Sequence, residues 1–336
     1  MYTAAADRYE SMEYRRCGTS GLRLPAISLG FWHNFGDDRS PEVQRALMRT
    51  AFDRGITHFD LANNYGPPSG AAEINAGRIL REDFAAHRDE LILSTKAGFQ
   101  LRPGPYGENG SKKYLTHSLD QTLRKLGVDY VDIFYHHRPD PETPLEETAE
   151  ALALAVLQGK ALHVGVSNYS ASQIEAMNEA LATWNLRLLV TQPPYSMFER
   201  TIEAELLPTV RRLGLGTVVW SPLQQGLLTD RYLDGTIPAD SRAAAGRFLH
   251  REDLTAEYYE RARALAGIAA DRGQTLAQLA LAWVLSTPGI TSAIVGASST
   301  TQLEQNLGAL DAPALTEEER ALIEPHAVDG TGRLTW

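Results

Sequence analysis

The sequence predicts an α/β protein built as a (β/α)8 TIM barrel. The chain has 336 residues, a length that α/β barrels commonly use for one domain. Short apolar runs alternate with segments of helical spacing, and such alternation with short links indicates a parallel sheet. Eight units of roughly 30 residues or more suit a closed barrel better than an open sheet. Because no linker or change of composition interrupts the pattern, we expect a single domain over residues 1–336.

The N-terminal part is expected to form a β-hairpin ahead of the barrel. Residues 15–25 contain two short segments around a Gly-Thr-Ser-Gly turn, which is typical of a hairpin. The first barrel strand is expected at residues 26–29. The first helix should begin at Ser40-Pro41, because serine is a favoured N-cap and proline is tolerated at the first helical position.

The other elements follow the same alternation of apolar runs and helical spacing. Further strands are expected at residues 56–60, 91–96, 130–137, 161–167, 188–192, 217–221 and 292–295. Further helices are expected at residues 71–81, 114–126, 144–157, 170–182, 202–213, 257–272, 275–285 and 301–310. A long polar loop over residues 224–254 follows the seventh strand, and an extra C-terminal helix at 316–323 opens with a Thr-Glu-Glu-Glu capping box.

Composition limits the partners and the location. A net charge of −10 argues against nucleic acid or an anionic membrane as a main partner. Cys17 is the single cysteine, so neither an internal disulfide nor a cysteine metal site is expected. No apolar run reaches the roughly 18 residues of a spanning helix, and the first residues lack the pattern of a signal peptide. We therefore expect a cytoplasmic location.

Four polar residues at or just after successive strand ends predict a proton-transfer site. Asp60, Lys96 and His137 end three strands, and Tyr65 follows Asp60 in a loop. Catalytic groups of such barrels lie at the C-terminal strand ends, so we expect the four to meet. An ammonium at Lys96, held by Asp60, would stabilise the anion of Tyr65, and a neutral His137 could donate to a carbonyl oxygen. Such a site would protonate a nascent alkoxide.

This chemistry needs a hydride donor, because none of the four residues can reduce a carbonyl. No G-x-G-x-x-G fingerprint follows a strand, and there is no Walker loop. Residues 296–306 instead combine small side chains with an expected helix N-terminus, which offers backbone N–H groups to an anion. A nicotinamide cofactor is therefore expected to place a phosphate after the last strand, as is common in these barrels.

The same motifs resemble those of the aldo-keto reductases, from Gly30 through Asn306. They are Phe-Asp60 with Tyr65-Gly66, Ser-Thr-Lys96, Asp-Ile-Phe-Tyr-His-His137-Arg-Pro, Gly-Val-Ser167-Asn168, Gln192-Pro-Pro-Tyr, Trp220-Ser221-Pro222-Leu223, and Gly296-Ala-Ser298 with Gln302 and Asn306. The segments at 32–36, 60–68 and 96–107 are similar to the bacterial L-glyceraldehyde 3-phosphate reductase branch. That branch is related to the potassium-channel β subunits.

The resemblance implies roles for these residues. Tyr65 would be the general acid, Lys96 and Asp60 its tuning pair, and His137 the donor that orients the carbonyl. Trp32, directly after the first strand, is expected to line the substrate pocket with Tyr65 and His137. The resemblance also implies contacts with the cofactor. Near the nicotinamide these are Trp32, Asp60, Ser167, Asn168 and Gln192, with Trp220 against the ring, and along the pyrophosphate they are Ser221, Pro222, Leu223 and Gln225. The loop over the cofactor contributes Arg231 and Arg242, and the adenosine phosphate and adenine would contact Gly296, Ser298, Gln302, Gln305 and Asn306.

The expected activity is NADPH-dependent reduction of small aldehydes, with L-glyceraldehyde 3-phosphate or methylglyoxal as the favoured class. NADP is expected over NAD, although residues 298–302 contain no lysine or arginine to bind a 2′-phosphate, so NAD stays open. Relatives of this branch imply a homo-oligomer, a tetramer or an octamer. One alternative is a cofactor-binding regulatory subunit with little turnover.

Two other readings of the site residues are weaker. A Schiff-base role for Lys96, as in aldolase-type barrels, is possible for a strand-end lysine. The motifs of the nicotinamide site count against it. His136 and His137 could not jointly bind one metal ion, because adjacent strand residues face opposite sides. We therefore expect no metal, and we expect His136 to point away from the site.

Overall fold

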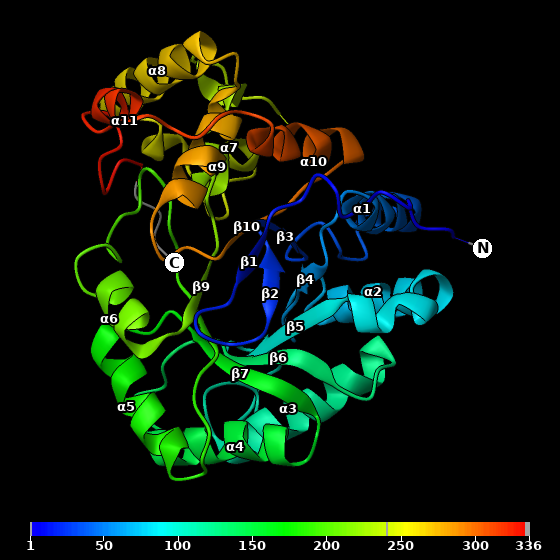
Figure 1. Cartoon of the computed structure of the whole chain (residues 1–336). Helices are drawn as coiled ribbons and strands as arrows, with labels where there is room; N and C mark the ends of the chain where they lie inside the picture. Colours follow the sequence, from blue (N-terminus) through cyan, green and yellow to red (C-terminus); the bar gives the residue numbers. More distant parts are fainter. Residues whose placement is uncertain (1, 240, 333–336) are drawn as a thin grey trace.

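The computed structural model describes residues 2–239 and 241–332, and a closed parallel barrel forms its centre (Figure 1). The strand order around the barrel is β10-β3-β4-β5-β6-β7-β8-β9. The strands are β3 (Ile27–Gly30), β4 (His58–Asp60), β5 (Ile92–Ala97), β6 (Val131–His136), β7 (Ala161–Ser167), β8 (Val190–Gln192), β9 (Gly216–Val219) and β10 (Ser292–Val295). The predicted TIM barrel is confirmed.

The predicted N-terminal hairpin is also present, and it closes one end of the barrel. Strands β1 (Tyr14–Arg16) and β2 (Arg23–Pro25) pair antiparallel, and they lie in front of the barrel in Figure 1. Cys17 and Leu24 of the hairpin are fully buried and belong to one apolar cluster with Ile92 and Val190, which begin β5 and β8. Parallel strands begin at one end and finish at the other, so the hairpin covers the end opposite the strand termini that carry the predicted site.

Helices surround the barrel in the predicted order. They are α1 (Pro41–Asp53), α2 (Ala71–Asp83), α3 (Lys112–Leu126), α4 (Leu145–Leu157), α5 (Ala171–Ala182), α6 (Leu206–Leu213), α8 (Ala256–Asp271), α9 (Leu276–Ser286), α10 (Thr300–Leu307) and α11 (Glu317–Ile323). Local sequence explains several starts, because Ser170, Thr275 and Thr316 each form a capping box with the residue three positions on. Short 3₁₀ helices η1 (Ala85–Glu90) and η5 (Gly308–Leu310) follow α2 and α10.

Helix α6 begins later than predicted. The sequence pattern placed its start at residue 202, whereas the structure begins it at Leu206 after a series of turns. Pro208 explains the difference, since proline has no N–H and its ring clashes with the carbonyl four residues earlier in a helix interior. A start at Leu206 keeps Pro208 within the first turn, where proline is tolerated.

The long loop after β9 has short helices that the sequence did not predict. They are η2 (Gln224–Gly226), η3 (Asp230–Tyr232), α7 (Arg242–Ala245) and η4 (Arg251–Asp253). The strand before the loop ends at Val219, two residues earlier than predicted, because Ser221 has a positive φ of 59° that an extended strand does not allow. The loop therefore has regular local structure over the end of the barrel that bears the site.

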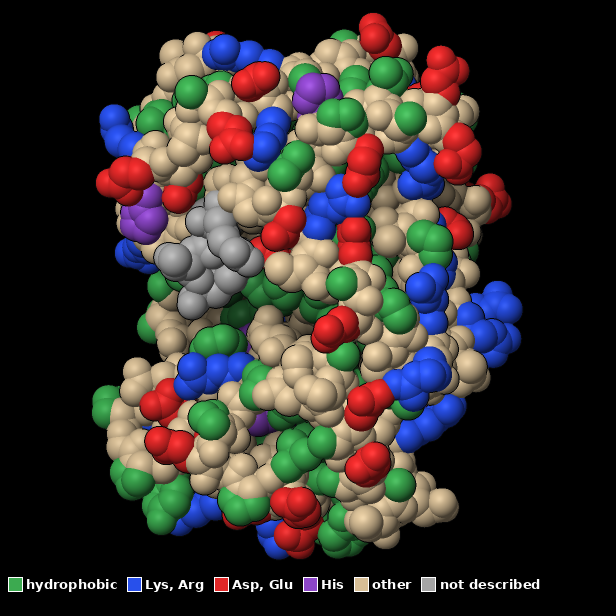
Figure 2. Space-filling model, turned by 90° about the vertical axis from the view of Figure 1, so that its left-hand side faces the viewer, with side chains coloured by type: hydrophobic (Ala, Val, Ile, Leu, Met, Phe, Trp, Pro, Cys, Tyr) green, Lys and Arg blue, Asp and Glu red, His purple; other side chains and the backbone are tan. Residues whose placement is uncertain are grey.

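Acidic and basic side chains are interspersed over the face that Figure 2 shows. Within residues 2–239 and 241–332, no helix combines the length and the hydrophobicity needed to cross a bilayer.

Candidate active site

The structure brings Asp60, Tyr65, Lys96 and His137 together at the C-terminal ends of neighbouring strands. Asp60 is the last residue of β4, and it pairs in register with Ser94 of β5. Lys96 therefore lies two residues further along β5, on the same side of the strand as Ser94. His137 follows the last residue of β6, and its N–H donates to the carbonyl of Ala97 at 2.9 Å.

Lys96 is fully buried and is bonded on several sides. Its Nζ lies 2.5 Å from Oδ2 of Asp60, donates to the carbonyl of Leu61 at 2.8 Å, and reaches the hydroxyl of Tyr65 at 3.3 Å. Burial alone would lower the pKa of Lys96, but the Asp60 carboxylate and Tyr65 outweigh it, so the pKa lies above the usual lysine value. Lys96 is thus held as an ammonium ion beside the phenol.

The hydroxyl of Tyr65 lies beside the ammonium of Lys96. Burial raises the pKa of its hydroxyl, and the ammonium of Lys96 opposes that rise by favouring the phenolate. The ammonium also lies 4.8 Å from the centre of the Tyr65 ring. At neutral pH the phenol therefore keeps its proton, while Lys96 is positioned to stabilise the anion that forms when the proton leaves.

His137 is neutral in this site. Burial, with a further contribution from Lys96, keeps the pKa of His137 well below its usual value. Its ring meets Tyr65 edge to face at 5.9 Å between centroids and Phe99 at 4.6 Å. Within the described residues Nδ1 of His137 has no hydrogen-bond partner. A neutral imidazole has one N–H, which suits a hydrogen bond to a carbonyl oxygen next to Tyr65.

Three predicted cofactor residues adjoin this group. Asn168 donates to the carbonyl of His137 at 2.9 Å and to the hydroxyl of Ser167 at 3.2 Å. The hydroxyl of Ser167 donates to the carbonyl of Gln192 at 2.7 Å. Gln192 in turn donates through Nε2 to Oδ1 of Asp60 at 3.0 Å. Ser167, Asn168 and Gln192 thus form one bonded group that reaches the Asp60 carboxylate.

Trp32 lies under the long loop. Its ring is 4.7 Å from the ring of Phe248 and 5.6 Å from the guanidinium carbon of Arg242. Arg242 also donates to Oε1 of Gln225, whose Nε2 bonds to the hydroxyl of Ser221 at 3.1 Å. Trp32 is half-buried, so its indole takes part in the contact between loop and barrel while keeping an accessible side.

The remaining predicted residues lie along the same loop and after β10. Trp220 pairs through its backbone with Pro194 beyond β9, and Pro222 and Leu223 lead into η2. Arg231 is exposed within η3. After β10, Oε1 of Gln302 accepts from both the N–H and the hydroxyl of Ser298, at 2.8 and 3.1 Å.

The segment after β10 fits a phosphate-bearing nucleotide. A Cβ added at Gly296 would meet only Nδ2 of Asn34 within 4 Å, at 3.6 Å, so this backbone is open to a neighbour. Nδ2 of Asn306 is buried and has no hydrogen-bond partner among the described residues. Gln305 is exposed on the same helix, α10. An open glycine, an orphaned amide donor and a helix N-terminus together match the donor set that an anionic nucleotide requires.

Sequence reasoning missed several residues around the site. His58 and Ser94 are buried inside the barrel and link to Asp60 through hydrogen bonds. The alternation of side chains along a strand could have identified both residues. His58 lies two residues before Asp60 and Ser94 lies two before Lys96, so each pair shares one face of its strand. Phe248 gave no such signal, since its contact with Trp32 depends on how the loop folds.

His136 points away from the site, as predicted. Its Nδ1 lies 2.6 Å from the hydroxyl of Tyr169, and burial lowers its pKa to about 4. Among the residues that the structure describes, no group of three or more histidine, cysteine, aspartate or glutamate side chains could hold a metal ion.

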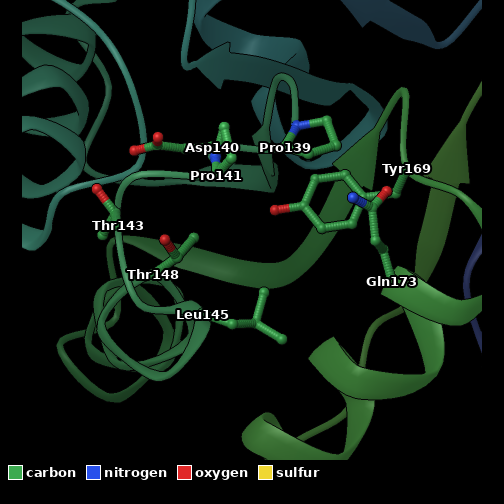
Figure 3. Close-up of a pocket in the computed structure, with 8 residues that line it drawn as sticks. All are labelled: Pro139, Asp140, Pro141, Thr143, Leu145, Thr148, Tyr169 and Gln173. Carbon is green, nitrogen blue, oxygen red and sulfur yellow. The ribbon is translucent and has the colours of Figure 1, made fainter.

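A separate pocket of about 430 Å³ lies beside α4 and α5, and none of the predicted site residues lines it (Figure 3). Tyr169 and Thr148 are among its lining residues. The carboxylate of Asp140 accepts from the backbone N–H groups of Gly110 and Glu142. This pocket is therefore distinct from the site around Tyr65.

The parallel barrel holds a buried Asp-Lys pair against a tyrosine and a neutral histidine, and the segment after its last strand is open to an anionic ligand. This combination is that of the nicotinamide-dependent oxidoreductases of the barrel class. A family model described as the Aldo/keto reductase family matches residues 26–327. The chain belongs to this family, and it is therefore an enzyme that uses a nicotinamide cofactor.

The curated relatives agree with this assignment. The chain is 52% identical over 341 residues to the L-glyceraldehyde 3-phosphate reductase of Escherichia coli (strain K12), covering 98% of this chain and 96% of the relative. It is 39% identical over 318 residues to a probable voltage-gated potassium channel subunit beta of Oryza sativa subsp. japonica, covering 93% of this chain and 96% of that protein. The predicted resemblance to both groups is confirmed.

Proposed function

We propose that this protein reduces small aldehydes to primary alcohols with NADPH, and that Tyr65 is the general acid. The observation that carries the proposal is the buried Asp60–Lys96 pair, whose ammonium lies 3.3 Å from the Tyr65 hydroxyl. The similarity to L-glyceraldehyde 3-phosphate reductases supports a short phosphorylated aldehyde as substrate, and methylglyoxal is the unphosphorylated alternative of similar size.

The chain's own residues supply orientation and a proton. When bound, the nicotinamide supplies the hydride for the carbonyl carbon. His137 holds the carbonyl oxygen with its N–H, and Tyr65 gives its phenolic proton to that oxygen as negative charge develops. Lys96 then stabilises the phenolate, and Asp60 keeps Lys96 charged and in place. Trp32 and the loop above it shield the reacting atoms from water.

Different groups of residues would hold the nicotinamide and the rest of the cofactor. Ser167, Asn168 and Gln192 would bind the carboxamide, with Trp220 against the ring. The segments 221–225 and 296–306, with Arg231 and Arg242 from the loop, would hold the phosphates and the adenosine. Because residues 298–302 contain neither lysine nor arginine, a 2′-phosphate of NADPH would be bound by hydroxyls, backbone N–H groups and a more distant arginine.

A Tyr65→Phe variant tests the proposed acid. The substitution removes the phenolic proton 3.3 Å from the Lys96 ammonium and keeps the ring, so kcat for aldehyde reduction should fall about a thousandfold. Binding of NADPH, measured by fluorescence titration, should stay unchanged. Tyr106→Phe, which removes the same hydroxyl from an exposed loop, is the matched control. Turnover retained in Tyr65→Phe would contradict the assignment.

A panel of aldehydes assayed with NADPH and with NADH tests the substrate and the cofactor together. We expect L-glyceraldehyde 3-phosphate and methylglyoxal to give the largest kcat/KM, and NADPH to give a lower KM than NADH. Equal constants with both cofactors would overturn the NADPH preference, and turnover confined to long apolar aldehydes would overturn the substrate class.

The similarity to channel β subunits favours one second candidate, a regulatory protein that binds the cofactor and turns over slowly. Steady-state and single-turnover assays separate the two, because a regulatory protein would show one fast turnover and then slow product release. We also propose a cytoplasmic homo-oligomer, a tetramer or an octamer, for which a solution mass measurement is the direct test.

A further inference from the structure

A chain of hydrogen bonds runs through the barrel interior and ends on Asp60. The hydroxyl of Ser292 on β10 lies 2.6 Å from that of Ser28 on β3, which lies 2.8 Å from Nδ1 of His58 on β4. Nε2 of His58 lies 2.9 Å from the hydroxyl of Ser94 on β5, which donates to Oδ1 of Asp60 at 2.8 Å. Four strands thus contribute to one continuous network. All five residues are buried.

The direction of every bond in this network follows from its last member. Because a carboxylate only accepts, Ser94 uses its one proton on Asp60, and its oxygen must accept from His58. His58 therefore carries its proton on Nε2. A neutral imidazole then has a bare Nδ1, which accepts from Ser28. Ser28 has no second proton, so Ser292 donates to Ser28. All four donors point toward the carboxylate.

The surroundings of His58 keep it neutral. Burial lowers its pKa to about 4, while Asp60 on its own strand raises the pKa and Lys96 on β5 lowers it. From β3 and β10 the groups that face it in the network are the uncharged hydroxyls of Ser28 and Ser292. The imidazole therefore serves as a hydrogen-bond relay of fixed direction, with one donor side and one acceptor side.

We propose that His58 is a positioning residue: through Ser94 it fixes the orientation of the Asp60 carboxylate, and thereby the place of Lys96 against Tyr65. Asp60 accepts from Ser94 and Gln192 on Oδ1 and from Lys96 on Oδ2. Without the donor from His58, the hydroxyl of Ser94 is free to turn away from Oδ1, and the carboxylate loses one of the bonds that set its plane. The inference rests on the proposed function of the tetrad.

Substitutions at His58 test the effect on the reaction. His58→Leu removes both ring nitrogens at similar volume, and we expect kcat to fall about tenfold while the KM for aldehyde and the Kd for NADPH stay the same. His58→Gln keeps a donor and an acceptor and should restore kcat to within about threefold of the original. Thr217→Val, which alters a fully buried strand residue outside the network, should leave kcat unchanged. If His58→Leu does not fold, Ser28→Ala tests the same network with no added bulk.

The proton position on His58 gives a second readout that needs no turnover. In ¹⁵N-histidine NMR spectra of the whole protein, the signal absent from His58→Gln identifies His58, and the two ring nitrogens differ strongly by protonation. We expect the neutral tautomer with the proton on Nε2 at pH 7. A proton on Nδ1, or a charged ring, would overturn the proposal, and so would wild-type kcat in His58→Leu.

These measurements separate this inference from the proposed function. A protein that reduces no aldehyde in the panel contradicts the proposed function, yet the tautomer of His58 still decides the direction of the network. A loss of NADPH binding in His58→Leu would mean that the residue supports the fold of the barrel rather than the position of Asp60, and would overturn the proposal.

Discussion

The proposed catalytic residues and the residues proposed to hold the cofactor differ in how their polar atoms are bonded. Lys96 and Asp60 are 0% and 2% exposed, and the contacts that their proposed roles require are already made. In the proposed cofactor site, by contrast, exposed Ser298 is bonded to Gln302, and Gln225 is bonded to Ser221 and Arg242. The Asp60–Lys96 pair is thus already bonded as its proposed role requires, whereas Gln302 and Gln225 use their polar atoms on neighbouring side chains.

This difference in bonding predicts which residues affect the rate of the reaction and which affect the affinity for the cofactor. A preorganised site needs no rearrangement as charge develops in the transition state, so its residues should affect kcat. In the proposed cofactor complex, the bonds between Ser298 and Gln302 and between Gln225 and Arg242 are exchanged for bonds to the ligand. That exchange costs part of the binding free energy, so substitutions there should affect the KM for the cofactor.

The largest effect is expected from Lys96→Met. Removing the ammonium leaves the phenolate of Tyr65 unstabilised and leaves Asp60 as an unpaired buried carboxylate. We expect kcat to fall about a thousandfold, and the free energy of unfolding to fall by about 3 kcal/mol because a buried charge loses its partner. Steady-state kinetics and thermal unfolding measure the two effects.

A double variant separates stability from chemistry. Asp60→Asn combined with Lys96→Met removes both charges, so thermal stability should largely return while kcat stays low. If activity returned together with stability, Lys96 would support only the fold. The Asp60–Lys96 pair would then have no direct part in the reaction.

Arg242→Ala should give a smaller effect, confined to the cofactor. The guanidinium lies over Trp32 and bonds to Gln225, next to the proposed pyrophosphate site. Loss of one charge-assisted contact to phosphate should raise the KM for NADPH about tenfold, with kcat changed less than about twofold. Arg251→Ala removes the same charge from an exposed position on the same loop and should leave both constants unchanged. A fall in kcat without a change in KM would contradict the division between the two regions.

Sequence alone could place the proposed catalytic residues because strand periodicity fixes their position. Asp60 and Lys96 end apolar runs, and the barrel brings such ends to one edge. The capping boxes at Ser170 and Thr316 fixed helix starts in the same local way. These features depend on interactions within a few residues or on the closure of the barrel, both of which the pattern encodes.

The features that escaped prediction depend on contacts between distant segments. The ring contact between Phe248 and Trp32 joins residues more than 200 positions apart, so it depends on how the long loop folds back onto the barrel. The network through His58 joins four strands, and its serines resemble any other small strand residues until the register is known. The late start of α6 differs, since Pro208 was visible in the sequence and a strict use of proline geometry would have found it.

The dependence of kcat on pH should be the smallest effect. It is also the sharpest test of the buried contacts among Asp60, Tyr65, Lys96 and His137. The pKa of Lys96 is raised, so its charge is present at neutral pH and is lost only as the pH rises through a value above 10.5. The pKa of His137 is depressed, so the ring is neutral at pH 7 and gains a proton only as the pH falls well below 6.5. We therefore expect kcat for aldehyde reduction to change less than about twofold between pH 6.5 and 9. A change in kcat near pH 6.5 would mean that His137 titrates as an exposed histidine does. A change in kcat near pH 8 would mean that Lys96 or Tyr65 loses its proton too early. Either result would show that the buried contacts do not set the protonation states of these residues.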